Sequence, residues 1–131
     1  MAKMRRAASI DIPDIVDMIE DLRVAVSGPV PVDRAWVSRT LAGLLASDDG
    51  YVAVTGGGFI AGILRPTIIN PALIAQEMGW FARDRSGLRL LRGFEAWASE
   101  RGATLVQLST GPEGLDLTRL GYRRAELAWV K

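Results

Sequence analysis

Four arginines and one aspartate lie at the start of a predicted helix. Their residue types and spacing suggest that this region binds an anion. The stretch WFARDRSGLRLLRGFEAW covers residues 80–97 and takes on helical apolar spacing from Gly87 onward. Arg83, Arg85, Arg89 and Arg92 gather at the end where that helix begins. A helix N-terminus carries partial positive charge and free N–H groups, so it favours anions over cations. Phosphate bound there by backbone amides and neutralised by the arginines would explain the pattern. A solvated basic first turn is the plainer alternative.

Two residue types are missing, which narrows the chemistry. The chain of 131 residues contains no cysteine and no histidine, and its only lysines are Lys3 and Lys131. Thiolate nucleophiles, cysteine metal sites and Ser-His-Asp or Cys-His catalysis are thereby excluded. Acid–base work must fall to Asp, Glu, Tyr, Lys, water or the backbone. We expect no metal site.

The composition predicts a single globular domain over residues 1–131. Apolar residues make up 49% and charged residues 24%, and the net charge is only +1. Charge is nevertheless uneven, with 6 basic and 8 acidic residues up to Leu64, and 10 basic and 7 acidic from Arg65 onward. The second half is therefore the expected home of an anionic ligand. No signal-peptide or membrane-spanning pattern is present, which favours a cytoplasmic location and no membrane partner.

The element pattern that must position these residues is an interleaved α/β order. Apolar spacing predicts helices that follow the N-cap candidates Asp11 and Asp33, and a third helix from Gly87 to about residue 101. Strands are predicted at residues 3–10, 51–55, 59–64, 73–82, 103–109 and 123–130, with a short helix at 113–120. Gly79 inside the fourth of these strands suggests a bulge or a close backbone approach. The sheet is expected to be mixed, with an antiparallel meander in the middle.

This order resembles the GCN5-related N-acetyltransferase (GNAT) family over nearly the whole chain. GFEAWASERGATLVQLST is similar to that family's third helix and fifth strand, and LTRLGYRRAELAWVK to its usual ending. The resemblance implies a GNAT-like fold, a mixed and mostly antiparallel sheet flanked by helices, in which strands four and five splay apart. It also implies acetyl-CoA as the cofactor, its pantetheine arm between those strands and its pyrophosphate on the loop before the long helix.

The resemblance assigns the cofactor contacts to the strand end and to the loop that follows it. They are Phe81, Ala82, Arg83, Arg85, Ser86, Gly87, Leu88 and Arg89. This loop departs from the family pattern of Arg or Gln, two residues, Gly, one residue, then Gly or Ala. With Gly87 in the last position, Arg85 stands at the first glycine and Ala82 at the leading basic position. Arg85 restricts the backbone but adds a charged donor for phosphate.

Catalytic candidates also come from the resemblance. Family members often use a Glu on the fourth strand as the base, and Glu77 is the only acidic residue of the predicted strand. Burial would raise its pKa toward a useful value; an outward-pointing carboxylate is the alternative. The family's usual acid, a Tyr four residues before the Gly of the closing pair, is replaced by Leu117. Tyr122, whose place is normally a core aromatic, and Ser109 at the end of the fifth strand are the remaining candidates.

The acceptor pocket is implied by the resemblance alone, because the loop between the first two helices usually forms its wall. Ser27, Gly28 and Trp36 are its candidates here. The expected activity is transfer of an acetyl group to a primary amine of a small molecule or peptide, with a homodimer possible. Two alternatives stay open. One is a GNAT-fold module, weak or inactive in catalysis, that binds CoA or another nucleotide. The other is nucleic-acid binding through the arginines, which lacks interleaved aromatics and is not expected.

Overall fold

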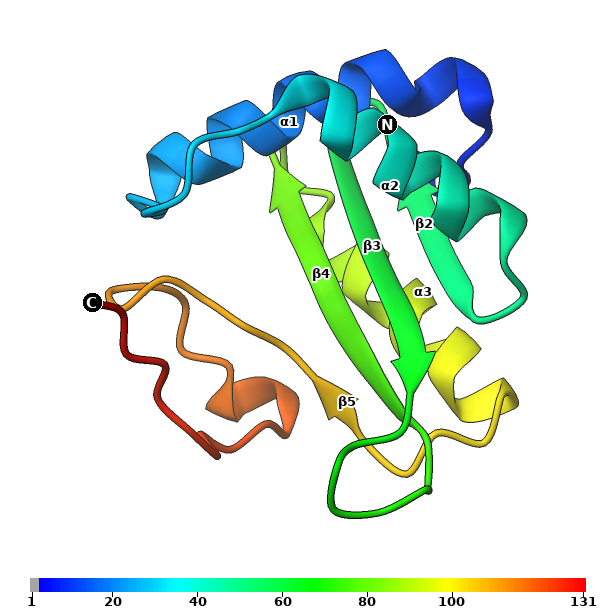
Figure 1. Cartoon of the computed structure of the whole chain (residues 1–131), viewed down its shortest axis with the longest axis vertical. Helices are drawn as coiled ribbons and strands as arrows, with labels where there is room; N and C mark the ends of the chain where they lie inside the picture. The colour runs from blue at the N-terminus through cyan, green and yellow to red at the C-terminus, as the bar shows by residue number, and fades with distance from the viewer. Residues whose placement is uncertain (1–2) are drawn as a thin grey trace.

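The computed structural model describes residues 3–131, which form one mixed five-stranded sheet (Figure 1). The strands are β1 (Arg5–Arg6), β2 (Gly50–Val54), β3 (Gly58–Arg65), β4 (Ile74–Ala82) and β5 (Val106–Gln107), in the spatial order β1-β2-β3-β4-β5. Neighbours pair antiparallel from β1 to β4, and β5 pairs parallel to β4. The predicted mixed sheet with an antiparallel meander is confirmed.

Helices cover both faces of this sheet (Figure 1). On one face, α1 (Ile12–Ala25) and α2 (Arg34–Ala46) bury a cluster with β2 and β3 that includes Ile15, Leu41 and Phe59. On the other, α3 (Gly87–Glu100) buries Leu90, Leu91, Phe94 and Trp97 against Tyr51, Ile60 and Leu64. Two short 3₁₀ helices, η1 (Ser9–Asp11) and η2 (Thr118–Leu120), complete the secondary structure. None of the helices over residues 3–131 is both long and apolar enough to span a bilayer.

The first two helices begin at the predicted residues, but only one aspartate caps its helix through the side chain. The Asp33 carboxylate accepts a hydrogen bond from the Trp36 N–H at 3.0 Å. Asp11 stands at the N-cap position of α1 without a cap hydrogen bond, and its carboxylate binds the Arg5 guanidinium and the Ala8 N–H instead. Asp11 therefore ties β1 to the start of α1.

A bulge in β4 and an early end to β5 open the sheet on one side. The β3–β4 register passes from Ala61↔Gly79 to Gly62↔Glu77, so Met78 is the extra residue and lies directly before the glycine at which we expected the bulge. The β4–β5 ladder contains only Ala75↔Val106 and Gln76↔Gln107. Beyond Gln76 the two strands diverge, which confirms the expected splay.

The C-terminal prediction was wrong in several particulars. The strand expected at 103–109 is reduced to β5, the helix expected at 113–120 to η2, and residues 123–130 form no strand. Trp129, within the segment expected to form the last strand, is 88% exposed. A strand at 123–130 would need a neighbour with free ladder groups, and a two-residue β5 offers almost none. The segment is attached by side chains instead, since Tyr122 packs on the α3 core and Gln107 donates to Glu126.

Candidate functional site

The point at which β4 and β5 separate is occupied by a carboxylate. Glu77 Oε1 accepts a hydrogen bond from the backbone N–H of Ser109 at 2.9 Å. Ser109 lies two residues after the end of β5. Glu77 directly follows Gln76, the last β4 residue that pairs with β5. A side chain thus replaces the ladder hydrogen bond that the diverging strands no longer make. The structure brings together the predicted base and the predicted strand-end hydroxyl residue.

Burial governs the protonation of Glu77. The side chain is half-buried between the strands, and desolvation raises the pKa of this carboxyl to about 7, against a smaller lowering by the Ser109 N–H. A carboxyl with this pKa is close to half ionised near neutral pH. It can therefore accept a proton in one step and release it in the next.

A groove of about 480 Å³ opens beside Glu77. Its lining residues come from the C-terminal half of β3 and the N-terminal half of β4, and they are Ile63, Arg65, Gln76, Glu77 and Met78. The bulge contributes directly, because its extra residue Met78 is 51% exposed on the rim. In Figure 1 the lower parts of β3 and β4 are not crossed by α1 or α2. The groove therefore gives a small molecule access to the Glu77 carboxylate.

The β4–α3 loop is tied to the β2–β3 turn by polar contacts. The Arg83 N–H donates to the Gly57 carbonyl at 2.7 Å, and the buried Ser86 hydroxyl lies 2.7 Å from the Thr55 hydroxyl. Trp80 Nε1 donates to the Gly87 carbonyl at 3.0 Å, which fixes the first turn of α3. These contacts hold the N-terminus of α3 at the end of β4.

An internal anion already lies at this helix start. Asp84 Oδ1 accepts hydrogen bonds from both the hydroxyl and the N–H of Ser86, the N-cap residue of α3. The Ser86 hydroxyl bond, the Ser86 N–H and the charge of Arg89 hold the pKa of Asp84 below its usual range. The Gly87 and Leu88 amides, in the first helical turn, have no carbonyl partner within the helix. The loop can thus receive an anion at Gly87 and Leu88, but Asp84 opposes its charge.

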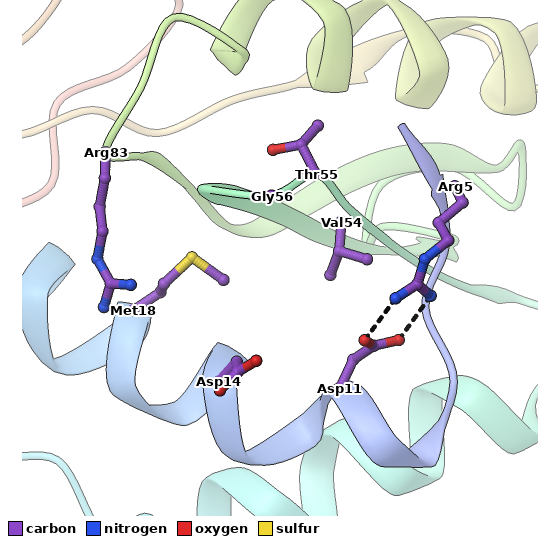
Figure 2. A pocket seen from close by; sticks show the side chains of 8 residues that line it. All are labelled: Arg5, Asp11, Asp14, Met18, Val54, Thr55, Gly56 and Arg83. Atoms are coloured by element: carbon purple, nitrogen blue, oxygen red, sulfur yellow. Dashed lines mark hydrogen bonds and ion pairs between the residues drawn. The ribbon is translucent and has the colours of Figure 1, made fainter. Parts of the chain in front are cut away.

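Arg83 is directed away from α3. Its Nε and Nη2 donate to Asp21 Oδ2 on α1 at 3.0 and 2.8 Å. Figure 2 shows this side chain pointing toward α1 at the edge of a cavity of about 330 Å³ that Arg5, Asp11 and Asp14 also line. Arg85 and Arg89, the other two arginines among the proposed cofactor contacts, are both exposed. Phe81 and Ala82, the other proposed cofactor contacts, are half-buried at the end of β4, and Phe81 packs toward the α1–α2 core.

The Tyr122 side chain makes its contacts with α3. Its hydroxyl donates to Glu95 Oε2 at 2.7 Å, and its ring packs on the α3 side of the core. Burial, then the hydrogen bond to Glu95, raises the pKa of Tyr122 well above its ordinary value. A phenol held in this way anchors the C-terminal segment, which fits the core role that the resemblance implied for this position.

The predicted acceptor-pocket residues lie in two places: Ser27 and Gly28 are in the turn after α1, and Trp36 is on α2. Ser27 has a left-handed backbone (φ 53°), and the Gly28 N–H bonds the Arg23 carbonyl at 2.9 Å. The Gly111 backbone, two residues after Ser109, approaches Val26 so closely that a Cβ on Gly111 would lie 3.1 Å from the Val26 Cβ. The Ser27–Gly28 turn thus neighbours the strand end that holds Ser109. Trp36 is 62% exposed on α2 beneath the Arg39 guanidinium.

Solved structures share this fold over nearly their full length. A predicted acetyltransferase from Clostridium acetobutylicum, solved with acetyl-CoA, matches with a TM-score of 0.81 at 16% identity, covering 100% of this chain and 95% of that one. A GNAT family acetyltransferase from Staphylococcus aureus matches with a TM-score of 0.69 at 15% identity, over 99% and 97% of the two chains. The chain has the GNAT fold.

The GNAT fold is shared by proteins with other descriptions as well. A transcriptional regulator from Bacillus halodurans matches with a TM-score of 0.79 at 19% identity, over 100% of this chain and 99% of that one. No protein-family model matches the sequence, and no curated protein matches it. The GNAT fold is therefore shown by structure, and the activity has to be argued from the site.

Three features of the site escaped the sequence reasoning. Met78 on the groove rim and Arg65 at its end depend on the bulge and on the β3–β4 register, neither of which periodicity specifies. Asp84 as an internal ligand of the α3 N-terminus carried a usable signal, because an Asp two residues before a Ser at a helix start commonly bonds that backbone.

Proposed function

We propose that the protein is an acetyl-CoA-dependent N-acetyltransferase that acts on a primary amine. The observation that carries this proposal is Glu77, a half-buried carboxyl with its pKa raised to about 7, at the point where β4 and β5 separate and beside an open groove. The GNAT fold supplies the context, and one structure of that fold contains acetyl-CoA.

The chain's own residues fit such a cofactor. Within the described residues, β4 beyond Gln76 pairs with β3 and not with β5, so its backbone groups on that side are available to an extended arm. The Gly87 and Leu88 amides with Arg85 and Arg89 offer donors to a pyrophosphate. When bound, acetyl-CoA supplies an acyl group activated as a thioester.

The chemistry then follows from Glu77. The ionised carboxylate removes a proton from the acceptor ammonium, directly or through a water, and the freed amine attacks the thioester carbonyl. As the amide forms, the C–S bond breaks, and the second proton of the amine passes through water or the Ser109 hydroxyl to the departing thiolate, which gives free CoA. Tyr122 is bonded to Glu95 and takes no part.

A second candidate is a module that binds CoA without turnover. Two observations favour it: Asp84 places a negative charge where a pyrophosphate would bind, and Leu117 stands where the family's tyrosine is expected. Both would weaken catalysis, but neither removes the Glu77 base.

Thiol release tests the proposal. The protein contains no cysteine, so a thiol-reactive dye reports CoA without background from the chain. We expect amine-dependent thiol release that falls sharply in Glu77→Gln. A thermal-shift comparison of acetyl-CoA, CoA and an oligonucleotide gives the binding arm, because a ligand bound only by the folded state raises Tm. Stabilisation by CoA with no turnover of any amine would favour the binding module, and stabilisation by the oligonucleotide alone would favour neither.

A further inference from the structure

The groove beside Glu77 is polarised along its length. Arg65 closes one end, where it is the last residue of β3 and pairs with Ile74. Glu77 lies three residues further along β4, which separates the two backbone positions by roughly 10 Å at about 3.3 Å per residue. Ile63 and Met78 supply apolar surface in the same groove. A cation from β3 and a carboxylate from β4 thus line one partly apolar groove.

The positive end is held in place without a neutralising carboxylate. Arg65 Nη1 donates to Gln76 Oε1 at 3.2 Å, and Nε donates to the Pro66 carbonyl at 3.4 Å. Both acceptors are neutral, and across residues 3–131 Arg65 forms no ion pair. Arg5, Arg34, Arg83, Arg92 and Arg101 each bind a carboxylate. Arg65 therefore keeps its full charge and free donors for an anionic group.

A second carboxylate lies on the β5 side, outside the residues that line the groove. Gln107 pairs with Gln76 in the parallel ladder, so both side chains lie on the same face of the sheet. Gln107 Nε2 donates to Glu126 Oε1 at 3.1 Å. Among the lining residues, Glu77 is therefore the carboxylate that favours an ammonium.

We propose that the acceptor is an ω-amino acid: a primary amine placed at Glu77, a short apolar chain along Ile63 and Met78, and a carboxylate bound by Arg65. This inference rests on the proposed function and names the acceptor class for the same groove. A diamine would bring its second cation against the Arg65 guanidinium, and a simple alkylamine would leave that guanidinium without a partner. Arg65 selects among amines and takes no part in the chemistry.

The test compares three acceptors of matched length: 6-aminohexanoate, hexylamine and 1,6-diaminohexane. For the parent we expect kcat/KM in the order 6-aminohexanoate, hexylamine, diamine. Arg65→Gln should lower kcat/KM for 6-aminohexanoate by roughly tenfold, the loss expected for one hydrogen bond to a charged group, chiefly through KM. Arg65→Glu should reverse the order and favour the diamine. The kcat/KM for hexylamine should change little in either variant, which would show that the site still folds.

Arg101→Gln serves as the matched control, because it removes one arginine from the end of α3 and leaves the groove untouched. Equal use of the three acceptors by the parent, or an unchanged order in Arg65→Glu, overturns the acceptor assignment and leaves the acetyltransferase proposal standing.

Calorimetry separates the two proposals if no amine is acetylated. With the CoA-loaded protein, binding of 6-aminohexanoate that is lost in Arg65→Gln supports the acceptor groove while the enzyme proposal fails. If the protein shows no turnover and no Arg65-dependent binding of 6-aminohexanoate, both proposals are overturned.

Discussion

The carboxylate of Glu77 on β4 accepts a hydrogen bond from the backbone N–H of Ser109, 2.9 Å away, across the point where β4 and β5 cease to pair. One contact therefore marks the end of the ladder and places an ionisable group beside an open groove. The same contact limits how far the strands diverge, since it joins β4 one residue after its last paired residue to the segment two residues after the end of β5.

Removing the base without changing its shape should stop the reaction and spare binding. We expect Glu77→Gln to lower turnover by roughly 10²–10⁴, the range for a lost general base, while acetyl-CoA affinity measured by calorimetry stays near the parent value. The amide oxygen of the substituted side chain can still accept the hydrogen bond from the Ser109 N–H. Parent-like turnover in this variant would remove Glu77 from the mechanism.

The pH dependence follows from the raised pKa of Glu77. The base must be ionised, so kcat/KM should rise with pH through about 7 and level off above it. Stability should respond in the opposite sense: between the ordinary carboxyl pKa and 7 the folded state holds a proton that the unfolded state has lost, so ionised Glu77 destabilises the fold as pH rises. The Tm of Glu77→Gln relative to the parent should therefore increase from pH 5 to pH 8. A Tm difference independent of pH would show that Glu77 titrates normally.

The charges at the start of α3 should set cofactor affinity. Arg85→Ala and Arg89→Ala should each weaken CoA binding, with a smaller loss at high salt because screening weakens the ionic contact. Arg83→Ala is the matched control, since this side chain is bonded to Asp21. Affinities equal to the parent's in both test variants would mean that these arginines are only solvated.

Asp84 should act against the cofactor. Asp84→Asn retains an oxygen for the Ser86 N–H and removes the negative charge, so we expect CoA to bind roughly two- to fivefold more tightly, the scale of one charge at a helix N-terminus. Calorimetry at low salt provides the measurement. A weaker complex would show that Asp84 organises the loop more than it repels phosphate.

Tyr122 should matter for stability and not for turnover. Tyr122→Phe keeps the ring but removes the donor to Glu95, which should cost about 1–2 kcal/mol of unfolding free energy. Thermal or denaturant unfolding measures this loss, and thiol release should remain close to the parent rate. A turnover loss as large as that of Glu77→Gln would instead assign the hydroxyl to catalysis.

Close packing of Phe94 on Gly62 should make substitution of that glycine destabilising. A Cβ there would lie 2.4 Å from Phe94 Cε1 and 2.8 Å from the Gln76 carbonyl oxygen, beside the bulge. Gly62→Ala should therefore cost about 1–3 kcal/mol through overpacking. Gly43→Ala in the middle of α2, where no atom lies within 4 Å, should instead stabilise by about 0.5–1 kcal/mol. Equal effects at the two positions would contradict this packing argument.

The sequence determined the elements whose signals are local. Apolar spacing placed α1, α2 and α3, and Asp33 caps its helix as predicted because that hydrogen bond spans only three residues. The resemblance to the GNAT family pointed to Glu77, the only acidic residue of the predicted strand, as the base candidate before any contact was known.

The tertiary structure decided everything that depends on register between distant segments. Residues 123–130, predicted as a strand, form none, because pairing needs a free neighbouring edge and the two-residue β5 provides almost none. Arg65, Gln76 and Glu77 line one groove only because the Met78 bulge sets how β4 lies against β3. Arg83 bonds to Asp21 because that residue, 62 positions earlier in the chain, lies across the fold from it. Such partners are fixed by packing of the whole domain, which local spacing does not encode.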